Sequence, residues 1–353
     1  MPGMTHIERV LTAVKHLPVD RFPTDIWMTP EVLSRLFSYF HVDNYIELLD
    51  QMDIDGIIDI APTYVGPETR RDGDYREDEW GMGYRKQPYG TGVYEEQVYF
   101  PLAQAQTISD LEKYPWPTPD WYDYSTLPIR ADQLGGRAVS CGYTAIFFWH
   151  NRLRGLELSL MDPILRPDFT HFLLGRLSDF FQEYHQRCFE ALKGKAQLTQ
   201  VTDDFGSQNG LLISPKIFDT FYRAPIQKAI DLAKSFGIYV FHHDDGDIRS
   251  LLPRLVEMGI TILNPVQWRC GDWDLDELKT RYGQALCFHG GVDNQQTLPF
   301  GTPQDVRAEV IRLKRTLGKD RTGIIIAPCH NIQPVTPIEN ILALYEAVRE
   351  ENT

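Results

Sequence analysis

The sequence predicts an α/β fold, a single (β/α)8 (TIM) barrel that spans residues 1–353. Two observations favour it: short apolar runs alternate with amphipathic segments, and polar residues follow five consecutive runs. Strands that alternate with helices pair in parallel through right-handed crossovers, and eight such units close a barrel. A doubly wound open sheet is the main competing architecture.

The strands are expected where apolar, often β-branched residues run together before Gly, Asn, Asp or Pro. Several of these runs are apolar throughout, as strands buried on both faces should be. The expected strands are 24–27, 56–60, 138–143, 197–202, 238–242, 260–264, 285–289 and 323–327.

Amphipathic segments between these runs predict the helices. Residues 247–258 precede a glycine, and 302–317 and 336–350 both open with Thr-Pro, an N-cap followed by proline at the first helical position. Another helix is expected to begin at Ser214-Pro215.

Residues 62–128 interrupt the alternation and are rich in Tyr, Trp, Gly, Asp and Pro. The stretch is too long for a structureless loop in a compact domain. We therefore expect an insertion after the second strand that carries a hairpin and forms a lid over the barrel mouth.

Composition excludes several classes of protein. The chain has 35 Lys and Arg against 49 Asp and Glu, a net charge of −14, which argues against a nucleic-acid or membrane partner. Its 42% hydrophobic and 12% aromatic content excludes global disorder. Five scattered cysteines without a CxxC motif, and no signal peptide or apolar run of about 18 residues, predict a cytoplasmic protein.

The segment His242-His243-Asp244-Asp245-Gly246 is the sharpest chemical signal. Alternation along an extended chain places His243 and Asp245 on one side, where they can offer a nitrogen and an oxygen to one metal ion. His330, after the eighth strand, would complete a three-ligand set typical of catalytic zinc.

Other interpretations of these residues remain open. His243 can be a histidine held by a neighbouring carboxylate, and Asp245 can cap the next helix. Two histidines and one carboxylate also describe the facial triad of non-haem iron oxygenases, which normally occupies an all-β scaffold. Cys329, beside His330, is expected to point away and to serve as a small core residue.

Further polar residues at the strand ends are candidates for contact with a substrate. Asp203 and Asp204 form a carboxylate pair suited to general acid–base catalysis, although either can cap a turn. Gln208, Gln267 and His289 are expected to bind substrate, with loop solvation or a tight turn as the alternative.

Motifs along nearly the whole chain resemble the uroporphyrinogen decarboxylase superfamily. The similar segments are Glu8-Arg9-Val10 with Asp20-Arg21-Phe22-Pro23, the run 203–210 with 213–215, the run 288–293, the run 298–303, and Thr336-Pro337-Ile338-Glu339-Asn340. The superfamily contains the decarboxylases and methyltransferases that serve corrinoid proteins, so the resemblance implies a barrel enzyme with one of these activities.

The resemblance also separates the two branches. True decarboxylases carry an arginine-rich motif that holds the substrate's carboxylates, whereas residues 27–32 here read Trp-Met-Thr-Pro-Glu-Val. The methyltransferase branch holds zinc with His-x-Cys-Gly and a later Cys, and those positions fall on His243, Asp245 and His330. The resemblance therefore implies a metal site in which harder ligands replace both cysteines.

Three functions follow as alternatives. The first is a methyltransferase or demethylase that uses zinc or another divalent metal, takes a small methylated substrate, and works with a corrinoid protein. The second is a decarboxylase that acts on a carboxylated substrate without metal. The third is a non-catalytic barrel that binds a small ligand.

Overall fold

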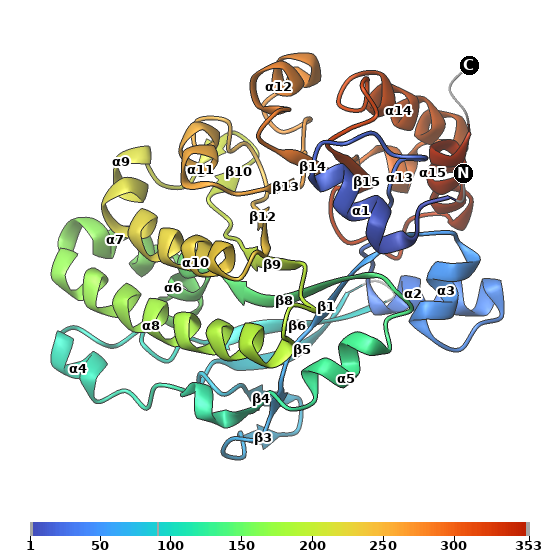
Figure 1. Cartoon of the computed structure of the whole chain (residues 1–353). Helices are drawn as coiled ribbons and strands as arrows, with labels where there is room; N and C mark the ends of the chain where they lie inside the picture. The colour runs from blue at the N-terminus through green and yellow to red at the C-terminus, as the bar shows by residue number, and fades with distance from the viewer. Residues whose placement is uncertain (1–2, 90–91, 351–353) are drawn as a thin grey trace.

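A computed structural model describes residues 3–89 and 92–350, and it is built around one curved parallel sheet (Figure 1). Seven strands follow one another in the order β1-β8-β9-β12-β13-β14-β15, and a helix lies in each connection between neighbours. This arrangement confirms the expected TIM-like barrel fold. The strands are β1 (Ile57–Ile60), β8 (Ala138–Thr144), β9 (Leu198–Val201), β12 (Tyr239–His243), β13 (Ile262–Asn264), β14 (Cys287–Val292) and β15 (Ile324–Pro328).

The remaining strand position is filled by a short irregular segment instead of the regular strand expected at 24–27. Isolated parallel bridges join Thr24 to Ile326 and Met28 to Ile332 on the β15 side. On the β1 side, the Gly56 N–H donates to the Thr24 carbonyl at 3.0 Å. Pro23 has no N–H to donate and Pro30 begins a helix, so too few residues remain for a full ladder.

Helices surround the sheet, and Figure 1 shows α1, which lies at one end of the barrel, near β15 although the two belong to opposite ends of the chain. Their bounds are α1 (His6–Val14), α2 (Pro30–Phe40), α3 (Tyr45–Gln51), α6 (Ile146–Arg154), α7 (Leu156–Leu165), α8 (Pro167–Leu192), α9 (Pro215–Ile217), the π-helical turn η2 (Phe218–Tyr222), α10 (Arg223–Ser235), α11 (Leu252–Met258), α12 (Leu275–Tyr282), α13 (Thr297–Phe300), α14 (Pro303–Arg315) and α15 (Ile338–Arg349).

The helices agree with the sequence except at the starts of α11 and α15. The helix expected at 247–258 begins only at Leu252, because Pro253 is accommodated only in the first turn of a helix. The opening Thr302-Pro303 is placed as expected, with Thr302 capping α14 through a capping box. At Thr336-Pro337 the expectation was wrong, because α15 begins at Ile338 with Pro337 as its N-cap and without a side-chain cap.

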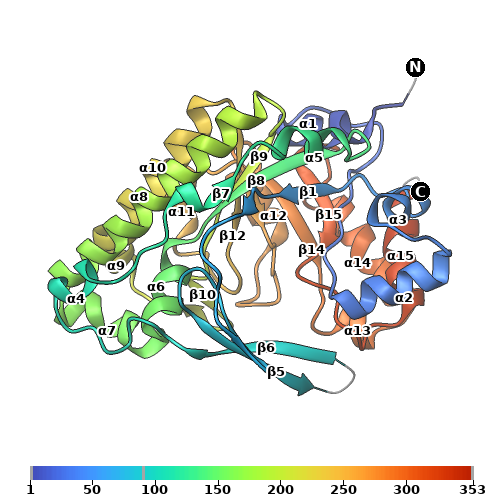
Figure 2. The same cartoon turned by 90° about the horizontal axis from the view of Figure 1, so that it is seen from below.

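The insertion at 62–128 holds its own small antiparallel sheet, in the order β3-β4-β5-β6. Figure 2 shows β5 and β6 as a long hairpin beside the barrel, which confirms the expected hairpin. Positions 90 and 91, between β5 and β6 in the sequence, lie outside the described residues. A lid function of the insertion stays a prediction. The elements between β1 and β8 are β2 (Thr63–Tyr64), β3 (Arg71–Asp72), β4 (Tyr75–Glu77), β5 (Gly83–Tyr89), β6 (Gly92–Tyr99), α4 (Ile108–Glu112), η1 (Pro119–Trp121), β7 (Tyr122–Asp123) and α5 (Leu127–Asp132).

A second small antiparallel pair follows β9. It consists of β10 (Gly206–Ser207) and β11 (Gly210–Leu211).

One end of the barrel is closed by α1. Val10, Ala13 and Val14 of α1 form a buried apolar cluster with side chains from the strands, among them Leu198 and Ile325. The opposite end, where the strands have their carboxyl termini, is left for polar residues. In the described part of the chain, we find no helix with the length and apolar character needed to cross a bilayer.

The fully buried carboxylate of Asp55 ties the chain together where the barrel closes. It accepts hydrogen bonds from Arg9, from Arg21 Nη1 at 2.9 Å, from the Thr24 N–H at 3.0 Å and from His6 Nδ1 at 3.0 Å. Burial alone would raise the pKa of Asp55, but the His6 hydrogen bond and the charges of Arg21 and Arg9 outweigh it and lower the pKa. The ionised form is therefore favoured in the folded state.

We predict that Asp55→Asn lowers the free energy of unfolding at pH 7 by about 3 kcal/mol, because it leaves two arginines without their buried partner. Asp53→Asn removes a half-exposed partner of Arg21, 2.9 Å away, and should cost less than about 1 kcal/mol. Urea denaturation of both variants measures the difference. Since the folded pKa of Asp55 is lowered, its contribution is present at neutral pH and declines as pH falls below about 4. Equal losses in the two variants would contradict this role.

Candidate functional site

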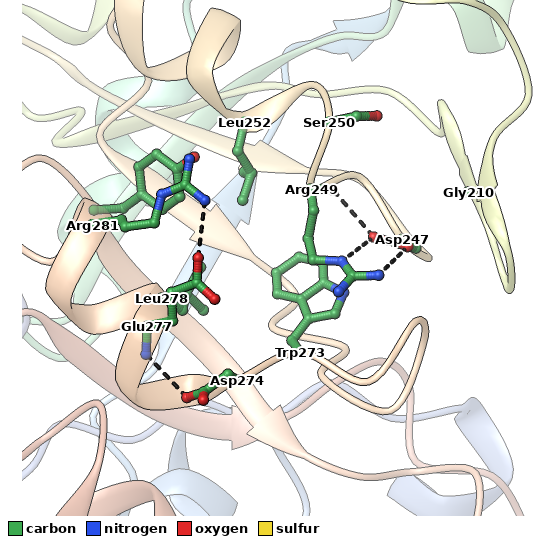
Figure 3. Close-up of a pocket in the computed structure, with 11 residues that line it drawn as sticks. Gly210, Asp247, Arg249, Ser250, Leu252, Trp273, Asp274, Glu277, Leu278 and Arg281 are labelled. Carbon is green, nitrogen blue, oxygen red and sulfur yellow. Dashed lines mark hydrogen bonds and ion pairs between the residues drawn. The ribbon is translucent and has the colours of Figure 1, made fainter.

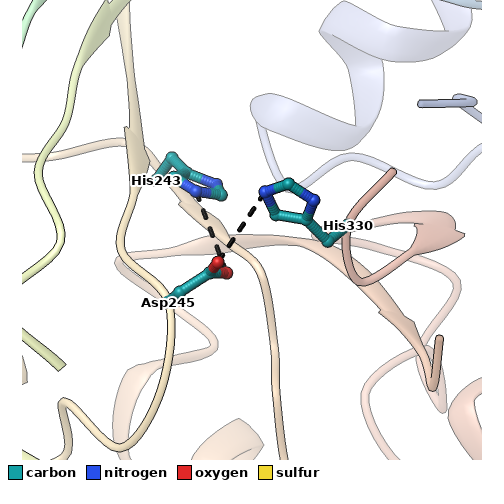
Figure 4. Close-up of side chains that lie close together, drawn as sticks. All are labelled: His243, Asp245 and His330. Carbon is teal, nitrogen blue, oxygen red and sulfur yellow. Dashed lines mark ion pairs between the residues drawn. The ribbon is translucent and has the colours of Figure 1, made fainter. Parts of the chain in front are cut away.

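Three side chains from two strand ends converge at the open mouth of the barrel (Figure 4). His243 ends β12, Asp245 follows two residues later, and His330 follows β15, and one ligand atom from each lies within 4.8 Å of the others. The Nε2 atoms of His243 and His330 lie 3.8 and 3.7 Å from the Asp245 carboxylate. The expected alternation is also found, since His242 and Asp244 are buried on the other side.

A buried chain of hydrogen bonds orients His243. Its Nδ1 lies 2.6 Å from Oδ1 of Asn264, the Asn264 Nδ2 lies 2.7 Å from Nδ1 of His289, and the His289 Nε2 lies 3.0 Å from Oδ2 of Asp25. A carboxylate only accepts, so His289 must donate from Nε2 and accept at Nδ1. The Asn264 oxygen then faces His243, which donates from Nδ1 and keeps the Nε2 lone pair free for the cluster.

Trp27 forms an apolar wall beside the cluster. Its ring centre lies 5.6 Å from that of His243 and 6.3 Å from that of His330, with an edge-on approach to His330. The residue belongs to the irregular segment that closes the barrel. Closure of the barrel and shape of the cluster therefore depend on the same few residues.

The predicted acid pair separates into two environments. Asp203 is buried and its Oδ1 accepts from the Phe148 N–H at 2.8 Å, so it caps the first turn of α6, which has no side-chain cap of its own. Burial raises its pKa well above the usual range. Asp204 is half-buried, and its Oδ1 lies 3.8 Å from Nε2 of His243. Of the pair, only Asp204 stands beside the cluster.

Burial also raises the pKa of Asp204, and the nearby charge of Asp245 adds to the effect, while His243 opposes it. For His330, burial lowers the pKa, with Asp245 opposing and His243 reinforcing the change. The neutral imidazole of His330 is therefore favoured, and a neutral imidazole is the form that binds a metal.

Gln267 supports the cluster through the backbone. Its Oε1 accepts from the Gly246 N–H at 2.6 Å, next to Asp245. Gly246 has φ +88°, and a Cβ there would stand 2.5 Å from the Ser207 carbonyl oxygen, so glycine is required in this turn. The structure thus gives Gln267 a positioning contact, and its contact with substrate stays a prediction.

Two other predicted substrate ligands lie elsewhere. Gln208 is exposed in the turn between β10 and β11, where its Oε1 accepts from the Cys270 thiol at 3.3 Å. His289 is only 1% exposed, and both of its nitrogens are engaged in the buried chain. Both nitrogens of His289 are thus occupied in this structure, and the contacts of Gln208 and His289 with substrate stay predictions. Cys329 is buried, with its Sγ 3.4 Å from the Val266 carbonyl, and points away as expected.

The residues at the cluster fit a metal ion. Oδ1 of Asp204 and Oδ1 of Asp245 are buried and have no hydrogen-bond partner among the described residues. Buried carboxylate oxygens normally have partners, and a cation held here would supply one for both oxygens. Two imidazole nitrogens and a carboxylate oxygen are a donor set that zinc and similar divalent ions accept.

A separate pocket lies beside the loop 247–250 and α12 (Figure 3). Its two arginines are already paired: Arg249 Nη2 lies 2.7 Å from Asp247, and Arg281 Nη1 lies 3.0 Å from Glu277. None of the three clustered residues lines it. We therefore place the candidate site at the barrel mouth.

Comparison with known proteins agrees with the barrel. The chain is 27% identical over 195 residues to a uroporphyrinogen decarboxylase of Prochlorococcus marinus, covering 53% of this chain and 49% of that protein. It is 24% identical over 285 residues to one of Pseudomonas fluorescens, covering 74% of each. The chain spans about half the length of most of the curated relatives it matches.

Among solved structures, a methyltransferase from Methanosarcina mazei superposes with a TM-score of 0.69 over 98% of both chains at 19% identity, which shows a shared fold. The model of the uroporphyrinogen decarboxylase (URO-D) family matches residues 141–351, more than half of the chain, and this stretch holds every residue of the cluster. The chain therefore belongs to the uroporphyrinogen decarboxylase family.

Proposed function

We propose that this protein is a metal-dependent methyltransferase or demethylase that acts on a small methylated substrate. The observation that carries the proposal is the convergence of His243, Asp245 and His330 at the mouth of the barrel. The fold shared with a methyltransferase over nearly the whole chain supports the same activity. A corrinoid protein is the proposed partner in methyl transfer.

The charge of the ligand set suits an oxygen or nitrogen substrate. Two neutral imidazoles and one carboxylate would leave a divalent ion with a net charge of +1, whereas a set with two thiolates would be neutral. A divalent metal with this charge would act as a Lewis acid toward the substrate atom that carries the methyl group. Asp204 lies beside the cluster, where its Oδ1 would hold a proton near the substrate. The ring of Trp27 would keep water away from one side of the cluster.

Decarboxylation is the alternative, because the curated relatives named above are uroporphyrinogen decarboxylases. A substrate with several carboxylates requires cationic side chains, yet the described mouth presents Asp204 and Asp245 and lacks the arginines expected near Trp27. Release of CO2 from uroporphyrinogen by chelated protein would favour this alternative. Metal-free protein without either activity would favour a non-catalytic barrel.

We predict that His330→Ala lowers metal affinity by more than about 100-fold. Loss of a residue that only hydrogen-bonds to a ligand typically lowers metal affinity by about 10- to 100-fold, and loss of a ligand itself should have a larger effect. Cys329→Ser should retain the metal, since that side chain points to the core. Elemental analysis of untagged protein measures metal content in both variants. Loss of metal from the serine variant alone would contradict the assignment.

We predict that Asn264→Ala weakens metal binding by about 10- to 100-fold, because His243 loses the acceptor that fixes its tautomer and ring orientation. Asn209→Ala, in the exposed turn between β10 and β11, is the matched control and should leave affinity unchanged. Competition with a chromogenic zinc chelator provides the affinities. An unchanged affinity for the Asn264 variant, with the fold intact, would show that the buried chain does not orient the ligand.

We predict that metal is retained at neutral pH and is lost with a midpoint below about 6.5, the usual pKa of a free imidazole. Protons compete with the metal for imidazole nitrogen, and burial lowers the pKa of His330, so protonation there requires a lower pH than usual. Metal content after dialysis between pH 8 and pH 5 measures the midpoint. A midpoint clearly above 6.5 would contradict the role of burial.

A further inference from the structure

A cavity of about 420 Å³ lies between the barrel strands β1, β8 and β9 and the inserted segment. Its walls are mainly aromatic, with Trp80, Trp149, Tyr122 and Tyr184 among them. The rings of Trp80 and Trp149 lie 4.8 Å apart between centres, and those of Tyr122 and Tyr184 lie 4.9 Å apart. Trp80 is nearly fully buried and fixes the wall, while the other three rings are half-buried. We call this cavity the aromatic pocket.

Two carboxylates give the aromatic pocket a negative charge. Glu79 comes from the insertion, and its Oε1 accepts from the Tyr122 hydroxyl at 2.8 Å. Asp59 comes from β1, and its Oδ2 accepts from the Gln200 amide at 2.9 Å. Among the described residues that line the pocket, there is no Lys, Arg or His to neutralise them. The Asp59 side chain is exposed to solvent. The surrounding protein nevertheless removes part of its hydration, which raises the pKa of the carboxyl group.

Aromatic faces and an uncompensated carboxylate together attract an organic cation. The face of an aromatic ring carries negative potential, and methyl groups on a cationic nitrogen spread its charge over a surface that also packs well against rings. We propose that the aromatic pocket binds a methylated ammonium group. This inference deepens the proposed function and rests on it, since it names the chemical class of the methylated substrate.

The aromatic pocket and the metal cluster lie at the carboxyl ends of the same sheet. Tyr143 lines the pocket and belongs to β8, which pairs with β9, and Asp204 follows β9. Asp204 in turn lies 3.8 Å from the free nitrogen of His243. A small substrate held in the pocket would therefore lie on the side of the sheet end that β8 and β9 share with Asp204.

Arg152 does not make the pocket a carboxylate site. It is absent from the lining, its Nη1 donates to the Gln97 Oε1 at 3.0 Å, and its guanidinium lies over the Phe148 ring, 4.8 Å from the centre. Its charge is therefore engaged outside the cavity. Benzoate, which combines a ring with a carboxylate, is a suitable competing probe.

The test is calorimetric titration of the full chain with choline and with 3,3-dimethylbutan-1-ol, a neutral molecule of the same shape. Choline should bind at least about 10-fold more tightly, since only it carries the charge that the carboxylates attract. Glu79→Gln should remove most of this preference while keeping an acceptor for the Tyr122 hydroxyl. Trp149→Leu should weaken choline binding about 10-fold. Glu96→Gln, exposed on β6, is the control and should change nothing.

Equal binding of the two probes, stronger binding of benzoate, or full choline preference in the Glu79 variant would overturn the inference. If Trp149→Leu fails to fold, the isosteric Glu79→Gln variant still decides the question. Metal content is measured on the same samples, so the two proposals can fail separately. Intact metal without a choline preference overturns only the ligand assignment, whereas choline preference in protein that never takes up metal overturns only the metal site.

Discussion

Two buried carboxylates complete the barrel where backbone pairing is insufficient. The segment between Pro23 and Pro30 forms only isolated bridges to β15 and to Ile332 after it, and Asp25 and Asp55 supply further bonds toward β1. Asp25 accepts from the Ile57 N–H at 3.1 Å, and Asp55 accepts from the Thr24 N–H at 3.0 Å. Closure brings the ends of β12 and β15 to the same mouth, so the cluster depends on these two side chains.

Asp25 joins this closure to the chemistry of the mouth. Its second oxygen binds His289, which leads through Asn264 to His243. The same closing segment brings Trp27 against the rings of the cluster. Within this series of hydrogen bonds, each buried polar group relies on the next for its partner. A change that loosens the closing segment would therefore disturb the orientation of His243 and also lower the stability of the fold.

Local signals in the sequence predicted most of the fold and the clustered residues. Runs of β-branched residues marked seven strands, and alternation in the segment 242–246 separated His243 and Asp245 from their buried neighbours. The expected strand at 24–27 was wrong in detail, because flanking prolines prevented a regular ladder. The pairing of His289 with Asp25, 264 positions apart, has no local signature, and neither has the contact of the insertion with strand ends that forms the aromatic pocket.

The cluster of His243, Asp245 and His330 contains no sulfur, and Cys329 beside it is buried with its thiol directed to the core. Thiolate ligands are lost when oxygen or peroxide converts them to sulfenic or higher acids, and such damage becomes irreversible beyond the first step. Imidazole and carboxylate groups do not follow that route. A metal centre built from imidazole and carboxylate ligands would therefore not lose its ligands to air by that route.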